Sequence, residues 1–280
     1  MQDPDVIGPV GTGAEIEVSQ NALAQKLGSG RNKKYVRFAV AALSAIPWIG
    51  GVIGASASFS AEHDQEQVND LHRLWLQEHQ SRVLQLGETL NDIFERLESF
   101  GDEIQERVES PGFLALVKQC FREWDEAETD DKREMLKKLI TNAAAITLCP
   151  DDLIRLFLNW IELYHEAHFA VIKEIYRHPG VTRGQIWDTI NRVRPREDSA
   201  EADLYRFLIR DLSTGGVIRQ QRETDGSGQF LKKDRPHVAR GMGAKVMTSA
   251  WDEIDPYELT KLGKQFVHYV MEDVAPQLGG

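Results

Sequence analysis

Ala170–Ile190, "AVIKEIYRHPGVTRGQIWDTI", is the most informative segment for the fold of the second half of this chain. Its apolar residues recur at helical spacing as far as His178, and Pro179-Gly180 then marks a turn. Thr182 follows as the N-cap of a second helix. The sequence therefore predicts two helices joined by a short connection.

A third helix follows in Ser199–Gln220, "SAEADLYRFLIRDLSTGGVIRQ", and we expect it to end at Gly215-Gly216. The side chains expected to face inward are Leu204, Phe207, Leu208 and Leu212. Two wing strands are predicted at Val217–Arg222 and Gln229–Lys233, around a tip at Asp225–Gly228.

Tyr257–Val270, "YELTKLGKQFVHYV", indicates a strand that leads into a closing helix. From Phe169 onward this order of elements resembles winged helix-turn-helix domains of the MarR/PadR kind, over about 100 residues. The resemblance implies that the third helix enters the major groove of DNA and that the wing contacts phosphates.

The residues expected to bind nucleic acid or a protein partner are Arg206 and Arg210 on the third helix and Arg219, Arg222, Lys232 and Lys233 on the wing. Four carboxylates at the start of that helix argue against a DNA-reading role, because they would repel phosphates: Glu197, Asp198, Glu201 and Asp203. A basic wing on a domain that binds protein is the alternative interpretation.

The overall charge is acidic, with 33 Lys and Arg against 44 Asp and Glu, which excludes a chain coated with nucleic acid along its length. The imbalance lies in residues 62–164, with 11 basic and 23 acidic residues, whereas residues 165–280 carry 17 of each. Cys120 and Cys149 fall in apolar helical patterns and predict buried free thiols in a reducing compartment.

Phe38–Ala61, "FAVAALSAIPWIGGVIGASASFSA", contains no charged residue. Pro47 and the glycines that follow it predict two short helices around a bend. The segment is either a hairpin buried in a helical bundle or one that inserts conditionally into a membrane, with basic residues upstream for anionic headgroups. The residues expected at a membrane are Lys33, Lys34, Arg37, Ile46, Pro47, Trp48, Ile49, Gly50, Gly51 and Gly54.

Beyond Ala61 the pattern is helical. A heptad seam over Val83–Ile104 predicts one helix, which Ser110-Pro111-Gly112 ends. Three further helices are predicted after it, and the last is a long one over Leu153–Ile175. Glu162 and His165 have the spacing of one half of a di-metal site. No second copy exists, so we predict no metal, no cofactor and no catalytic residues.

The fold class expected is mainly α, in four parts: a mobile arm with a basic cluster (1–37), the apolar hairpin or membrane-active segment (38–61), an acidic helical bundle (62–164) and the winged helix domain (165–280). The layout loosely resembles bacterial defence proteins that pair a hydrophobic hairpin with a regulatory domain. It favours a non-enzymatic, conditional membrane-acting effector, cytoplasmic or peripheral at the inner membrane, whose winged helix binds a protein partner. The alternative is a DNA-binding transcriptional regulator with a helical dimerisation scaffold. A homo-oligomer is expected in both cases.

Overall fold

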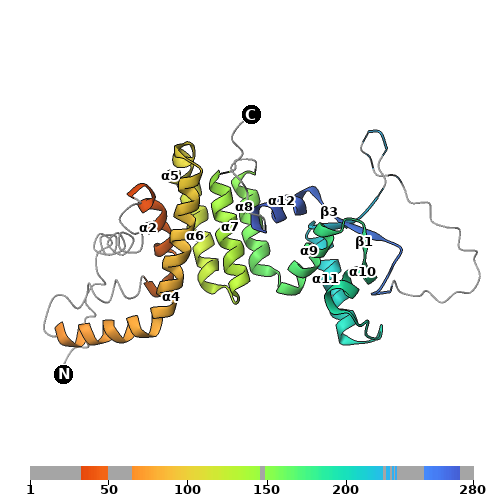
Figure 1. The fold of residues 1–280 in the computed structure, drawn as a ribbon, viewed down its shortest axis with the longest axis horizontal. Helices are drawn as coiled ribbons and strands as arrows, with labels where there is room; N and C mark the ends of the chain where they lie inside the picture. Colours follow the sequence, from red (N-terminus) through yellow and green to blue (C-terminus); the bar gives the residue numbers. More distant parts are fainter. Residues whose placement is uncertain are drawn as a thin grey trace, which may run out of the picture. The chain divides into compact units, whose positions relative to one another are not determined.

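The computed structural model describes residues 33–49, 65–145, 149–222, 225–227, 229, 231 and 249–271. Over these residues the protein is mainly helical, with one small antiparallel sheet (Figure 1). Backbone contacts divide the chain into two units. The first comprises Met1–Glu162 with Tyr269–Gly280, and the second comprises Leu163–His268.

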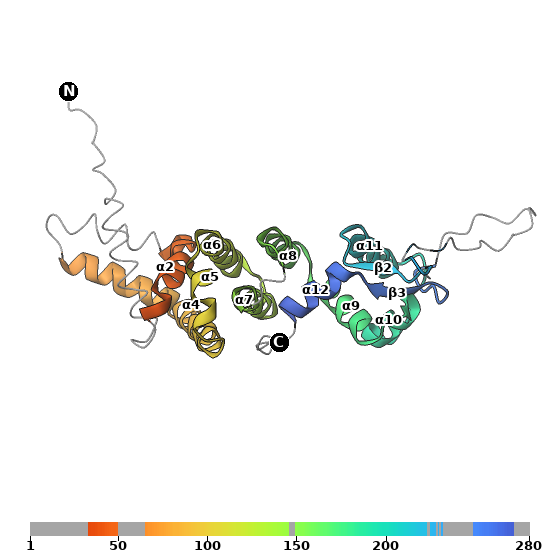
Figure 2. The same ribbon diagram turned by 90° about the horizontal axis from the view of Figure 1, so that it is seen from above.

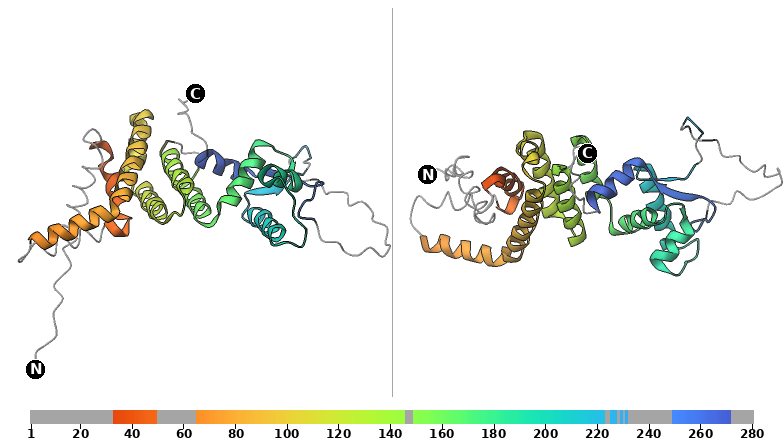
Figure 3. Two further views of the ribbon diagram at one scale, coloured as in Figure 1. Left: turned by 60° about the horizontal axis from the view of Figure 1, so that its bottom comes forward. Right: turned by 45° about the horizontal axis from the view of Figure 1, so that its top comes forward.

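The described part of the first unit is built from helices alone. In chain order these are η1 (Lys33–Tyr35), α2 (Val36–Ser44), α4 (Gln65–Ser99), η2 (Asp102–Ile104), α5 (Gln105–Glu109), α6 (Pro111–Glu126), α7 (Asp130–Ala145) and α8 (Asp151–Leu163), the last ending at the unit boundary. Figure 3 shows α4, which begins in orange, as the long helix of this unit.

Helix α2 packs along α6 and also contacts α5 (Figure 2). Phe38 is 1% exposed, and its ring centroid lies 5.7 Å from that of Phe94, 6.3 Å from Phe113 and 6.1 Å from Phe121. The first half of the uncharged segment is therefore bundle core. Its second half, residues 50–61, lies outside the described residues, so the complete hairpin stays a prediction.

The predicted heptad seam is confirmed from Leu86 to Leu97, where the seam residues of α4 are fully buried. The helix ends at Ser99, and Gly101 follows with a φ of 81°, a conformation that favours glycine. In the described part of the chain, no helix combines the length and apolar character needed to cross a bilayer.

The second unit combines helices with the sheet. Its elements are α9 (Glu166–Arg177), β1 (Val181–Thr182), α10 (Arg183–Asn191), α11 (Ala200–Thr214), β2 (Ile218–Gln220), β3 (Pro256–Leu259) and α12 (Lys261–Val270). The strand order is β1-β3-β2, and both pairings are antiparallel. Tyr257 at the middle of the sheet pairs with Val181 on one side and Gln220 on the other.

The turn between α9 and α10 forms as the sequence predicts. Gly180 has a φ of 91°, which a residue with a side chain rarely adopts. Thr182 caps α10: its hydroxyl accepts a hydrogen bond from the Gln185 N–H, and the Gln185 side chain accepts one from the Thr182 N–H.

The prediction of one long helix over Leu153–Ile175 is wrong. The chain breaks at Tyr164-His165, so that α8 ends and α9 begins anew. His165 is extended, and its N–H donates to Nδ1 of His168 over 3.1 Å, which caps the new helix. A side-chain bond to the backbone competes here with helix continuation.

Two further details of the second unit differ from the expectation. On α11, Leu208 and Leu212 are buried as predicted, but Leu204 and Phe207 are 55% and 44% exposed. The buried stripe instead continues through Ala202 and Tyr205. Strand β2 pairs with Pro256–Leu259, and Asp225 begins a turn by accepting the N–H groups of Ser227 and Gln229. Most of the predicted second wing strand, Gln229–Lys233, lies outside the described residues, so it stays a prediction.

Candidate anion-binding groove

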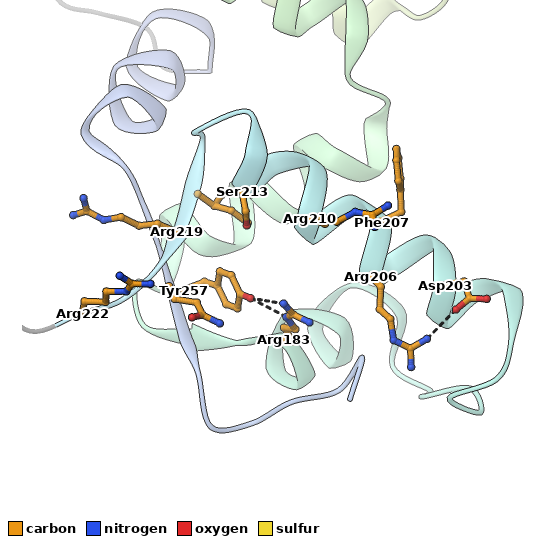
Figure 4. A pocket seen from close by; sticks show the side chains of 11 residues that line it. Arg183, Asp203, Arg206, Phe207, Arg210, Ser213, Arg219, Arg222 and Tyr257 are labelled. Carbon is orange, nitrogen blue, oxygen red and sulfur yellow. Dashed lines mark hydrogen bonds and ion pairs between the residues drawn. The ribbon is translucent and has the colours of Figure 1, made fainter. Parts of the chain in front are cut away.

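The described residues of the second unit form an open groove of about 890 Å³ between α11 and β2 (Figure 4). We call it the arginine groove, because five arginines and a single carboxylate line it. Its lining residues are Arg183, Asp203, Arg206, Phe207, Arg210, Ser213, Ile218, Arg219, Gln220, Arg222 and Tyr257. The excess of guanidinium groups makes the groove suited to an anion.

Arg183 and Tyr257 are joined by hydrogen bonds inside the groove. Nε and Nη2 of Arg183 donate to the Tyr257 hydroxyl over 2.9 and 2.7 Å. The backbone carbonyl of Arg183 accepts the Tyr205 hydroxyl over 2.7 Å. Burial raises the pKa of Tyr205, so this hydroxyl keeps its proton and its hydrogen bond. The sheet and α11 thus hold Arg183 from both ends.

Arg206 is occupied by the acidic start of α11. It pairs with Glu197 and, over 2.9 Å, with Asp203. Partial burial opposes ionisation of Glu197, but hydrogen bonds from the Ser249 hydroxyl and the Ala250 N–H, with the Arg206 charge, hold its pKa below the usual value. This carboxylate therefore joins α11 to the chain segment that returns towards β3.

The remaining arginines reach the groove from its two sides. Arg219 on β2 is bonded across the sheet to Glu258 on β3 over 2.8 Å. Arg210 on α11 and Arg222 after β2 are exposed and make no ion pair with any residue that the structure describes. These two side chains are the ones available to an incoming anion without breaking an existing pair.

Four of the six residues predicted to bind nucleic acid or a partner come together here: Arg206, Arg210, Arg219 and Arg222 all line the groove. Lys232 and Lys233 lie outside the described residues. Sequence reasoning missed Arg183 and Tyr257, which belong to a helix start and a strand 74 positions apart. Only the pairing of β1 with β3 brings them together, so no local pattern could have found them.

The residues predicted at a membrane are divided between core and surface. Ile46 and Ile49 are buried, and Trp48 Nε1 donates to Asp125 over 2.6 Å. Lys34 is bonded to Asp102, over 2.6 Å. Pro47 and Arg37 are exposed, and Lys33 begins η1. Gly50, Gly51 and Gly54 lie outside the described residues.

Glu123 in the first unit is a half-buried carboxyl group with an altered pKa. Burial raises the pKa of Glu123 to about 7, although a hydrogen bond from the Gln119 side chain acts to lower it. The Oε2 atom of Glu123 has no hydrogen-bond partner among the described residues. Glu123 lines a cavity of about 140 Å³ with Glu126, Glu162 and the buried Lys132. Among the described residues no three His, Cys, Asp or Glu side chains are arranged to hold a metal ion. Cys120 and Cys149 are buried free thiols, as predicted.

No protein-family model, curated protein or solved structure matches this chain.

Proposed function

We propose that this protein is a nucleic-acid-binding regulator, and that its second unit is a winged helix domain which binds duplex DNA through the arginine groove. The observation that carries the proposal is the gathering of five arginines in one groove between α11 and β2. The element order supports the assignment, since a helix, a short strand, two helices and a two-stranded hairpin are the components of a winged helix.

Ion pairs at the acidic start of α11 reduce the repulsion that its carboxylates would exert on DNA phosphates. Glu197 and Asp203 are paired with Arg206, and Asp198 is paired with Arg196 over 2.9 Å. Much of this negative charge is therefore neutralised inside the unit and repels phosphates less than four free carboxylates would. The unpaired Arg210 and Arg222 supply positive charge that can reach a phosphate backbone.

The test is fluorescence anisotropy of a labelled duplex titrated with the full chain at several salt concentrations. The double variant Arg210→Ala with Arg222→Ala should weaken binding and make the slope of log K against log salt shallower by about two. The matched control replaces two exposed arginines outside the groove, Arg122→Ala with Arg177→Ala, and should keep the slope of the natural chain. Equal slopes in both double variants would refute the proposal, as would absence of duplex binding at low salt.

A protein partner is a second candidate, because Leu204 and Phe207 leave apolar surface on α11 exposed. Homo-oligomerisation stays a prediction, which light scattering would test against the 31.7 kDa of one chain. The membrane-acting effector expected from the sequence ranks below both, since the described half of its apolar segment is core.

A further inference from the structure

Tyr257 carries a hydrogen-bond donor that nothing in the described structure uses. The residue is 2% exposed and lines the groove beside Arg183 (Figure 4). Its oxygen accepts two N–H groups of Arg183. A phenol that accepts two hydrogen bonds still has its own O–H to donate, and no described residue accepts it. An acceptor atom of a ligand in the groove could receive this O–H.

Arg183 offers further donors at the same place. A guanidinium group has five N–H bonds, and only two of those of Arg183 have a described acceptor, both in Tyr257. The side chain is held by the Tyr257 oxygen and the backbone by Tyr205. The donors are therefore already in position before a ligand binds, so that little side-chain entropy is lost on binding.

The ligand that fits these donors must consist of acceptors and carry more than one negative charge. Asp203 is the one carboxylate among the described residues that line the groove, and it is paired with Arg206. Arginine forks match the oxygens of a phosphate in two parallel bonds. The surrounding arginines exceed what a single carboxylate would neutralise.

We propose that Arg183 and Tyr257 form a phosphate-binding subsite of the arginine groove. The Tyr257 O–H and the free N–H groups of Arg183 donate to the oxygens of one phosphate group, and Arg210 and Arg222 contact the same or a neighbouring group. In taking that phosphate to belong to a nucleic acid backbone, the inference rests on the proposed function. A free pyrophosphate would offer the same oxygens.

The experiment compares Tyr257→Phe, which removes the hydroxyl alone, with Tyr176→Phe, a tyrosine of α9 outside the groove lining. Each full-length protein is titrated with inorganic pyrophosphate by calorimetry and with a labelled duplex by anisotropy. Tyr257→Phe should bind both ligands about tenfold more weakly, the usual scale for a hydrogen bond to a charged group. Tyr176→Phe should bind like the natural chain.

Arg183→Lys keeps the charge and removes the fork, so it should show a comparable loss of binding. Thermal unfolding without ligand shows whether each variant folds, and the rise in Tm on adding pyrophosphate gives a second reading of binding. The rise should be present in Tyr176→Phe and small in Tyr257→Phe.

The two ligands separate this inference from the proposed function. Pyrophosphate binding that depends on Tyr257, without duplex binding, supports the subsite and refutes the nucleic acid role. Duplex binding that is equal in both tyrosine variants refutes the subsite and leaves the nucleic acid role intact. Binding of neither ligand by the natural chain overturns both.

Discussion

The acidic segment 62–164 and the segment 165–280 that follows it differ in how their charges are distributed. Residues 62–164 carry a large acidic excess, and their interior is apolar and aromatic around α2. Residues 165–280 carry equal numbers of basic and acidic groups, yet four of the groove's five arginines come from α11 and the β2 strand region that faces it. In this protein the net charge of a segment does not indicate which part of it can bind an anion. The positions of the charges in space do indicate it. Glu197 and Asp203 both pair with Arg206, so that Arg210 and Arg222 are left without an ion pair among the described residues.

The largest effect is expected in the first unit, from Phe38→Ala. Removing a ring packed among three other rings should cost about 3–5 kcal/mol of unfolding free energy, through lost burial and a cavity. Urea unfolding followed by circular dichroism measures it. Leu84→Ala on α4, 58% exposed, is the control and should change stability by about 0.5 kcal/mol or less. A loss below about 1 kcal/mol in Phe38→Ala would show that α2 is not core.

A paired substitution on α11 tests the inward face that the structure assigns in the second unit. Leu212→Ala, at a fully buried position, should cost about 2–5 kcal/mol. Leu204→Ala on the same helix is exposed and should stay within about 0.5 kcal/mol. The measurement is again urea unfolding. Comparable losses in the two variants would mean that Leu204 packs inward, as the sequence pattern suggested.

A smaller, pH-dependent effect is expected from Glu123→Gln in the first unit. The folded pKa of about 7 lies above the ordinary 4.5, so the folded state holds this proton more tightly than the unfolded state. That stabilisation is fully present below pH 4.5 and is lost as the pH rises through 7. Glu123→Gln should flatten the decline in Tm between pH 5 and 8, whereas Glu126→Gln, at an exposed neighbour, should keep most of it, because burial raises the pKa of Glu123 more than the Glu126 charge does. An unchanged decline in Glu123→Gln would exclude Glu123 as its source.

The smallest effect is expected at a lipid surface. With α2 packed in the bundle, the purified protein should release no dye from anionic liposomes, and Gly54→Glu should behave in the same way. Dye release by the natural chain that the variant abolishes would contradict the assignment of the apolar segment to the bundle core. It would make the first unit a membrane-acting effector and the second its control element, as the sequence first suggested.

Local signals in the sequence predicted local structure well. The N-cap of α10 at Thr182 and the break at Ser110, which caps α6, are both confirmed, because a cap depends on residues within one turn of each other. The same reasoning failed at Tyr164-His165, where a histidine-mediated cap interrupts a continuous apolar pattern. It also failed on α11, since apolar residues occupy more of that helix than its neighbours cover.

Periodicity, caps and charge along the chain were enough to predict the mainly helical class, the helices on either side of Pro179-Gly180 and four arginines of the groove. The sequence pattern did not predict that α2 is bundle core, that β2 pairs with Pro256–Leu259, or that Arg183 is hydrogen-bonded to Tyr257. Each of these depends on contacts between residues far apart in the chain, where burial and hydrogen bonding are settled by packing and not by neighbours in sequence.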